Sequence, residues 1–114
     1  MPDLGALHDL LAGAHVDAEV FALRPDYRAS LVAVDGLVPG PSDQESDALL
    51  RAAEVAAAEA LRHQPLEQLP HVAAWREAYR AFGAKPQRTR NSVEALLRRA
   101  ASGLPRIDRL TDVY

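Results

Sequence analysis

The tripeptide Pro39-Gly40-Pro41 limits the fold of this chain more than any other feature. Proline has no backbone N–H group and a fixed φ, so neither a helix nor a central strand continues through two prolines this close together. Ser42-Asp43-Gln44-Glu45 follows at once and places a Ser three residues before a Glu, which is the spacing of a helix N-terminus. The sequence therefore predicts a long, alanine-rich helix from about Asp43 to Leu61.

The segment before the break has the composition of strands. β-branched and aromatic residues are frequent from Val16 to Leu23 and again from Ser30 to Val34, and such residues favour strands. The turn-forming residues Arg24-Pro25-Asp26 separate the two runs, and Asp35-Gly36 follows the second. Two strands are therefore predicted in this part of the chain.

Two further helices are predicted after the long one. Pro70 occupies a helix start, where proline is tolerated, and Gly83 follows at a typical helix end. Between them, large apolar side chains recur on one helical face: Val72, Trp75, Tyr79 and Phe82. Asn91-Ser92-Val93-Glu94 then has the spacing of a second helix start, and Gly103-Leu104-Pro105 is a stop signal.

The order of these elements indicates the fold class. Two strands, three main helices and a further extended segment are typical of an α+β fold with two or three short strands. The length of 114 residues fits one small domain over residues 14–114, preceded by a short helical arm over residues 1–13. The chain has no cysteine, no apolar run long enough to span a membrane and no leader-like start, so we expect a cytoplasmic protein without a membrane partner.

Positive charge is concentrated near the C-terminus. Residues 75–114 hold nine of the thirteen basic side chains and four of the sixteen acidic ones, so this part carries +5 while the whole chain carries −3. Four cations lie within eleven residues: Arg80, Lys85, Arg88 and Arg90. Such a cluster can neutralise the phosphates of a nucleic acid. The alternative is that arginines such as Arg76 and Arg80 pair with Glu77 or with aspartates of the acidic half, or that the arginines only solubilise the surface.

Other kinds of chemistry find little support in the residues. The four histidines, at positions 8, 15, 63 and 71, do not have the spacing of metal ligands. The chain has no glycine-rich phosphate loop, and no serine has the sequence context of a nucleophile. We therefore predict no cofactor and no metal, and assign no catalytic residue.

The basic region also carries a combined motif. A Tyr-Arg-Ala-Phe-Gly-x-Lys-Pro block runs from Tyr79 to Pro86, and a helix and a Leu-Pro-x-Ile segment from Leu104 to Ile107 follow it. In this combination the chain resembles free-standing proteins related to the tRNA-binding and editing domain of the phenylalanyl-tRNA synthetase beta subunit. The resemblance covers residues 14–114 and corresponds to the N-terminal half of that domain.

The resemblance implies an α+β domain that holds the aminoacyl end of a tRNA and hydrolyses the ester bond of a wrongly attached amino acid. It suggests tRNA contacts for four residues: Arg80, Lys85, Arg88 and Arg90. It places Asp112 and Tyr114 at the rim of the pocket.

The last residues depart from the family pattern, which reads Ile-Asn-Asn-x-Val-Asp-x-x-Asn and ends on an Asn at the pocket. Ile107 and Asp112 match, Asp108 and Arg109 replace the two asparagines, and the chain stops one position before the last Asn. Family members continue beyond this point and supply most of the pocket. We therefore expect tRNA binding but no competent deacylation by these 114 residues alone.

A second interpretation from another functional class stays open. The chain is then a non-catalytic interaction module of the same fold, which docks RNA or an acidic partner. In either case half of such a domain exposes an unpaired sheet edge, and we expect self-association through that edge.

Overall fold

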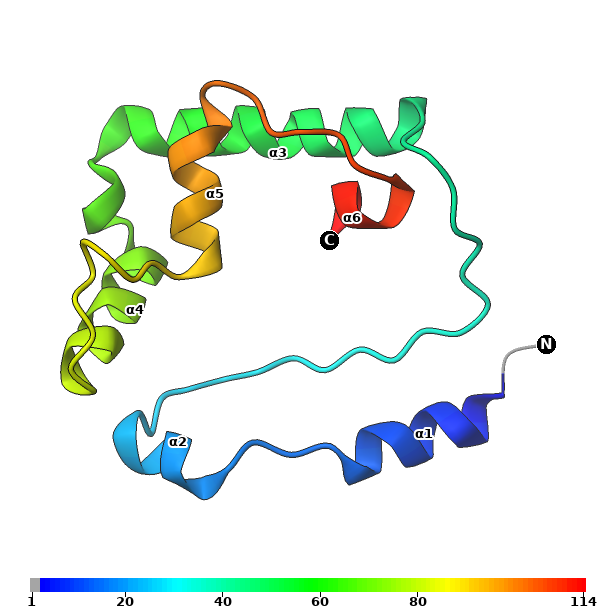
Figure 1. Cartoon of the computed structure of the whole chain (residues 1–114), viewed down its shortest axis with the longest axis horizontal. Helices are drawn as coiled ribbons and strands as arrows, with labels where there is room; N and C mark the ends of the chain where they lie inside the picture. The colour runs from blue at the N-terminus through cyan, green and yellow to red at the C-terminus, as the bar shows by residue number, and fades with distance from the viewer. Residues whose placement is uncertain (1–2) are drawn as a thin grey trace. The chain divides into compact units, whose positions relative to one another are not determined.

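The computed structural model describes residues 3–114, and over this range the protein is all-helical (Figure 1). The helices in chain order are α1 (Leu4–Gly13), α2 (Ala18–Leu23), α3 (Gln44–His63), the 3-10 helix η1 (Leu66–Gln68), α4 (Pro70–Ala81), α5 (Ser92–Ala100) and α6 (Arg109–Val113). The predicted α+β fold is wrong, because residues 3–114 contain no strand. None of the helices in this range combines the length and the apolar content needed to cross a membrane.

The chain divides into two compact units between Val38 and Pro39, at the start of the Pro39-Gly40-Pro41 tripeptide. In the N-terminal unit, the short helix expected near the N-terminus is present as α1, and the Asp3 carboxylate accepts a hydrogen bond from the Ala6 N–H at its start. Near α2, the rings of Phe21 and Tyr27 meet edge to face, with centroids 6.1 Å apart.

The strand predicted from Val16 to Leu23 is wrong, since most of this run forms α2. Asp17 caps the helix by accepting a hydrogen bond from the Glu19 N–H at 3.0 Å. Ala, Glu and Leu are good helix formers, and with a cap they outweigh the β preference of two neighbouring residues. The helix ends before Pro25, because the residue that precedes a proline avoids the helical region.

The strand predicted from Ser30 to Val34 is also wrong. The run lies outside any helix or strand and has no ladder partner within residues 3–114. β propensity reflects packing in a paired, half-buried sheet, so it does not create a strand where no neighbour pairs with it. The sheet edge expected to mediate self-association is therefore absent from the described part of the chain.

Helix α3 confirms the long helix predicted after the break. Its capping residue is Asp43 and not Ser42: the Asp43 carboxylate accepts from the Ser46 N–H at 2.8 Å, and the Ser46 hydroxyl accepts from the Asp43 N–H at 2.9 Å. This reciprocal pair satisfies two exposed N–H groups. Helices α4 and α5 are confirmed as well, with Pro70 in the first turn of α4 and Asn91 as the cap of α5.

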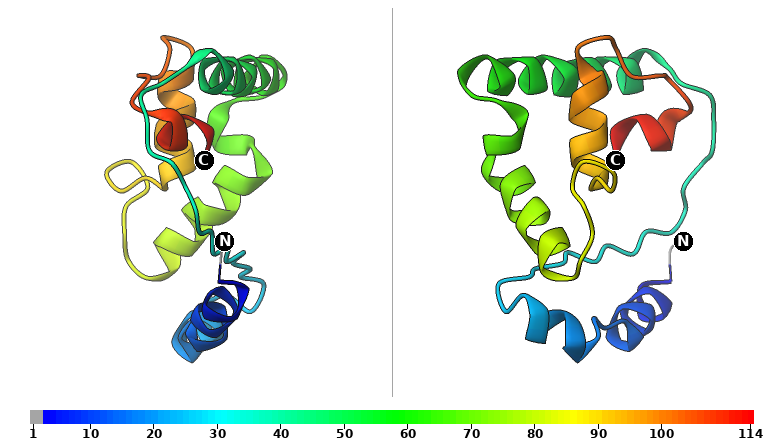
Figure 2. Two further views of the ribbon diagram at one scale, coloured as in Figure 1. Left: turned by 90° about the vertical axis from the view of Figure 1, so that its right-hand side faces the viewer. Right: turned by 60° about the vertical axis from the view of Figure 1, so that its left-hand side comes forward.

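Within the C-terminal unit, the chain leaves α3, turns through η1 into α4 and returns by a loop to α5, which ends next to α3 (Figures 1 and 2). The segment after α5 then runs along α3, and α6 packs beside it (Figure 1). The expected extended segment near residue 104 is present, but it pairs with no strand and leads into α6.

The core of this unit is small and partly polar. The buried apolar residues are Val72, Ala78, Pro86 and Ala100, and three polar side chains are equally buried: Ser46, Glu94 and Asp112. Every buried side-chain nitrogen and oxygen among the described residues has a hydrogen-bond partner. Polar contacts therefore fix the arrangement of helices as much as apolar packing does.

Candidate nucleic-acid interface

The apolar face of α4 leads directly to the basic region. Val72 is 1% exposed, and the rings of Trp75, Tyr79 and Phe82 follow it along the helix in edge-to-face contacts. The centroids of Trp75 and Tyr79 lie 5.9 Å apart, and those of Tyr79 and Phe82 lie 5.3 Å apart. Burial decreases along this row, since Phe82 at its end is 55% exposed.

A glycine cap ends α4 immediately after Phe82. The Ala84 N–H donates to the Tyr79 carbonyl at 2.9 Å and the Gly83 N–H to the Arg80 carbonyl at 3.1 Å, the bond pair of a Schellman motif. Gly83 has φ +89°, in the left-handed region that favours glycine. The cap turns the chain away from the helix axis and sets the direction of the loop that follows.

The residues around this cap form what we call the basic segment, residues 80–90. It contains four basic and no acidic side chains. Arg80, Lys85 and Arg88 are exposed, and their side chains make no ion pair or hydrogen bond with any residue in the range 3–114. Arg80 lies in the last turn of α4, where a cation interacts favourably with the helix dipole. Three of the four predicted contact residues are thus free cations.

The fourth predicted contact, Arg90, lies in a different environment. Its Nε atom is 3.3 Å from the carboxylate of Glu94 in the first turn of α5, and the Arg90 side chain is 41% exposed. Glu94 is almost completely buried and is shared with two other arginines, Arg76 at 2.7 Å and Arg98 at 3.3 Å. Arg90 therefore anchors the end of the basic segment to α5 and offers less free charge than its neighbours.

The shared carboxylate joins α4, α5 and η1. Arg76 donates to both oxygens of Glu94, and Arg98 also donates to Glu67 of η1 at 3.0 Å. The Arg76 hydrogen bond, followed by the charges of Arg76 and Arg98, keeps the pKa of Glu94 below its usual range despite burial. The ionised cluster holds the two helices that flank the basic segment in one arrangement.

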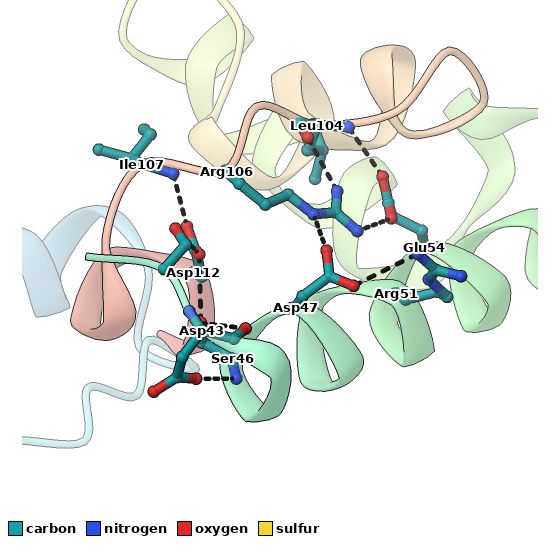
Figure 3. A network of polar contacts seen from close by, with 10 residues as sticks. Asp43, Ser46, Asp47, Arg51, Glu54, Leu104, Arg106, Ile107 and Asp112 are labelled. Atoms are coloured by element: carbon teal, nitrogen blue, oxygen red, sulfur yellow. Dashed lines mark hydrogen bonds and ion pairs between the residues drawn. The ribbon is translucent and has the colours of Figure 1, made fainter. Parts of the chain in front are cut away.

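A second polar network fixes the segment after α5 on α3 (Figure 3). Arg106 donates to Asp47 and to Glu54, each at 2.8 Å, and the Leu104 N–H donates to Glu54 at the same distance. Hydrogen bonds to Glu54 and then Asp47 raise the pKa of Arg106, so its guanidinium stays charged. Arg106 therefore serves the fold and is not available to a phosphate.

Asp112, one predicted rim residue, belongs to this second network. Its carboxylate accepts a hydrogen bond from the Ser42 hydroxyl at 2.6 Å. It accepts another from the Ile107 N–H at 2.8 Å (Figure 3). These two hydrogen bonds, the one from Ser42 first, lower the pKa of Asp112. Asp112 is only 6% exposed and holds α6 against the start of α3, whereas Tyr114, the other predicted rim residue, is 92% exposed. The structure does not bring these two side chains into a common polar contact among residues 3–114.

Sequence reasoning missed the two networks but had a signal for one of them. Glu94 follows Arg90 and precedes Arg98 by four residues each, the spacing at which side chains meet on a helix. That pattern predicts an ion-pair row on α5, although it does not reveal that Arg76 joins the row from another helix. The pairing of Arg106 with Asp47 and Glu54 spans more than fifty residues, and no local pattern indicates it.

Within residues 3–114, no group of three or more His, Asp or Glu side chains has a geometry that could hold a metal ion. Comparison with protein families, with curated proteins and with solved structures finds no match for this chain.

Proposed function

We propose that this protein binds RNA, and specifically tRNA, through the basic segment. The observation that carries the proposal is the free positive charge of Arg80, Lys85 and Arg88, which stand exposed in a stretch without an acidic residue. Polyphosphate backbones attract such clusters, since each neutralised phosphate releases a condensed counterion. Free cations held at the end of a capped helix suit this role better than cations already paired.

The contrast with the other arginines supports the proposal. The C-terminal unit has several arginines that carboxylates already neutralise: Arg76, Arg90, Arg98, Arg106 and Arg109. An arginine whose charge is balanced internally gains less from a phosphate, because the new contact competes with the old one. The unpaired charge of this unit therefore gathers in the basic segment, with Arg99 as a further exposed cation on α5.

The choice of tRNA comes from the Tyr79–Pro86 block and the Leu104–Ile107 segment, which resemble the editing domain of the phenylalanyl-tRNA synthetase beta subunit. The proposal is therefore a binding role within aminoacyl-tRNA quality control, in the cytoplasm where tRNAs are charged. We assign no catalytic residue and propose no hydrolysis by this chain alone, because ester hydrolysis needs a positioned water and donors for an oxyanion. Asp112, one rim candidate, already uses its carboxylate in internal hydrogen bonds.

The test is the salt dependence of tRNA binding. We expect the affinity of the unmodified chain to fall steeply between about 50 and 200 mM salt. In a variant with Arg80→Gln, Lys85→Gln and Arg88→Gln, the log–log slope becomes shallower by about 2, because each lost phosphate contact removes roughly 0.7 to 0.9. A matched control changes three exposed arginines elsewhere by the same charge: Arg51→Gln, Arg62→Gln and Arg99→Gln. If the slope became equally shallow in both variants, the binding would come from nonspecific charge attraction and not from a localised site.

A further inference from the structure

Phe82 is exposed at the position where the basic segment turns. It is the cap residue of α4, it lies between Arg80 and Gly83, and it is 55% exposed. Its only ring contact among the described residues is with Tyr79, at an interplanar angle of 61°. An edge-to-face contact uses either the edge of Phe82 or one of its faces, so at least one face of the ring lies outside that contact.

We propose that Phe82 is a stacking platform for an unpaired base, so that the basic segment selects single-stranded RNA over duplex RNA. This inference rests on the RNA-binding function proposed above and adds the structural class of the ligand. Every base has a π face, and an aromatic side chain beside a cationic groove is how proteins hold single strands without reading their sequence. In this arrangement the cations bind the phosphates and Phe82 binds the base.

The local geometry suits such a platform. Tyr79 contacts the Phe82 ring from the preceding turn of α4, and the Schellman bonds of Gly83 and Ala84 fix the backbone on its other side. A ring held in this way loses little freedom when a base stacks on it. Lys85 and Arg88 follow Phe82 by three and six residues, so the free cations lie on the same short segment as the ring.

Duplex RNA does not use such a platform well. In an A-form helix the bases stack on each other and their faces are closed to a protein, while unpaired bases can be splayed onto aromatic side chains. A duplex is therefore expected to contact only the cations. Comparing the affinities of single-stranded and duplex RNA separates the contribution of the Phe82 ring from that of the charges.

The experiment compares three probes by fluorescence anisotropy: oligouridine of about 12 nucleotides, a duplex of the same length, and an abasic strand with the same phosphates. The expected result is that the full chain binds oligouridine about 10-fold more tightly than either of the other two. Phe82→Leu removes this advantage, since it keeps an apolar side chain without a π face. Phe82→Tyr retains the advantage.

The outcomes separate this inference from the proposed function. Salt-dependent binding that is equal for all three probes and unchanged in Phe82→Leu would overturn the stacking role and leave RNA binding intact. No binding of any RNA by the full chain would overturn both. The comparison of probes on the unmodified chain does not depend on the folding of any variant, and circular dichroism of Phe82→Leu shows whether its helices are retained.

Discussion

The guanidinium of Arg76 on α4 donates to the carboxylate of Glu94 on α5 at 2.7 Å, and Glu94 is only 1% exposed. This contact crosses between the two helices that the basic segment connects. Arg90, at the end of that segment, reaches the same carboxylate. The basic segment is therefore fixed by the glycine cap that ends α4 and by the buried ion-pair cluster at the start of α5.

Removing the buried carboxylate is expected to destabilise the chain strongly. Glu94→Ala leaves Arg76, whose side chain is 12% exposed, without its main partner. Breaking a buried ion pair from one side costs about 3 kcal/mol, since a charge is left uncompensated. Urea denaturation followed by circular dichroism measures the loss. The matched control is Glu59→Ala, whose exposed pair with Arg62 contributes less than about 1 kcal/mol. Equal losses of stability in both variants would show that the buried Glu94 cluster stabilises the fold no more than an exposed ion pair does.

The same carboxylate makes stability depend on acid. The pKa of Glu94 in the folded chain lies below its unfolded value of about 4.3, mainly because Arg76 donates to its ionised form. The contribution of Glu94 is therefore complete above that unfolded value and is lost as the pH falls toward the folded one. The difference in unfolding free energy between the unmodified chain and Glu94→Gln should shrink as the pH is lowered from 6 to about 3. If this difference in unfolding free energy stayed constant from pH 6 to about 3, the lowered pKa of Glu94 would be contradicted.

Arg106 is expected to hold the segment after α5 on α3. Arg106→Lys keeps the charge, but an ammonium group lacks the planar fork that reaches Asp47 and Glu54 together. The Leu104 N–H and the Ile107 N–H, which donate to Glu54 and Asp112, should then exchange faster with deuterium. Amide exchange followed by NMR measures this effect.

Arg51 provides the control for Arg106. It also pairs with Asp47, at 3.3 Å, but its side chain is 72% exposed. Arg51→Gln should leave the exchange of the Leu104 and Ile107 amides unchanged, because exposed pairs contribute little. If both variants accelerated exchange to the same extent, the effect would come from the loss of one ion pair at Asp47. It would not come from the guanidinium of Arg106 contacting Asp47 and Glu54 together.

Local signals in the sequence predicted α1, α3, α4 and α5 but neither α2 nor α6, and contacts between distant residues could not be predicted. Pro39, Pro70, Gly83 and Asn91 act through their own backbone or cap chemistry, so the ends of α3, α4 and α5 were predicted closely. The strand at Ser30–Val34 failed because a strand requires a neighbour, which composition does not supply.

In the candidate site too, local sequence order was predictive and contacts between distant residues were not. The grouping of Arg80, Lys85 and Arg88 in one short segment followed from their order in the sequence. The separation of free cations from paired ones depended on Glu94, Glu54 and Asp47, whose partners lie on other elements. Charge counting alone treats Arg88 and Arg106 alike, although one is free and the other is held by two carboxylates.

Gly83→Ala is expected to disturb the turn on which the basic segment depends. A Cβ at this position meets no atom within 4 Å, so its cost arises only from the left-handed backbone at φ +89°. That cost is about 1 kcal/mol in unfolding free energy, and Gly83→Asn should lose less because Asn tolerates this region. Gly13→Ala is the matched control: its Cβ also meets open space, but the residue ends α1 without a positive φ, so alanine there should be neutral or stabilising. Thermal unfolding of the three variants measures their order of stability. If Gly83→Ala were as stable as Gly13→Ala, the cap of α4 would not require glycine.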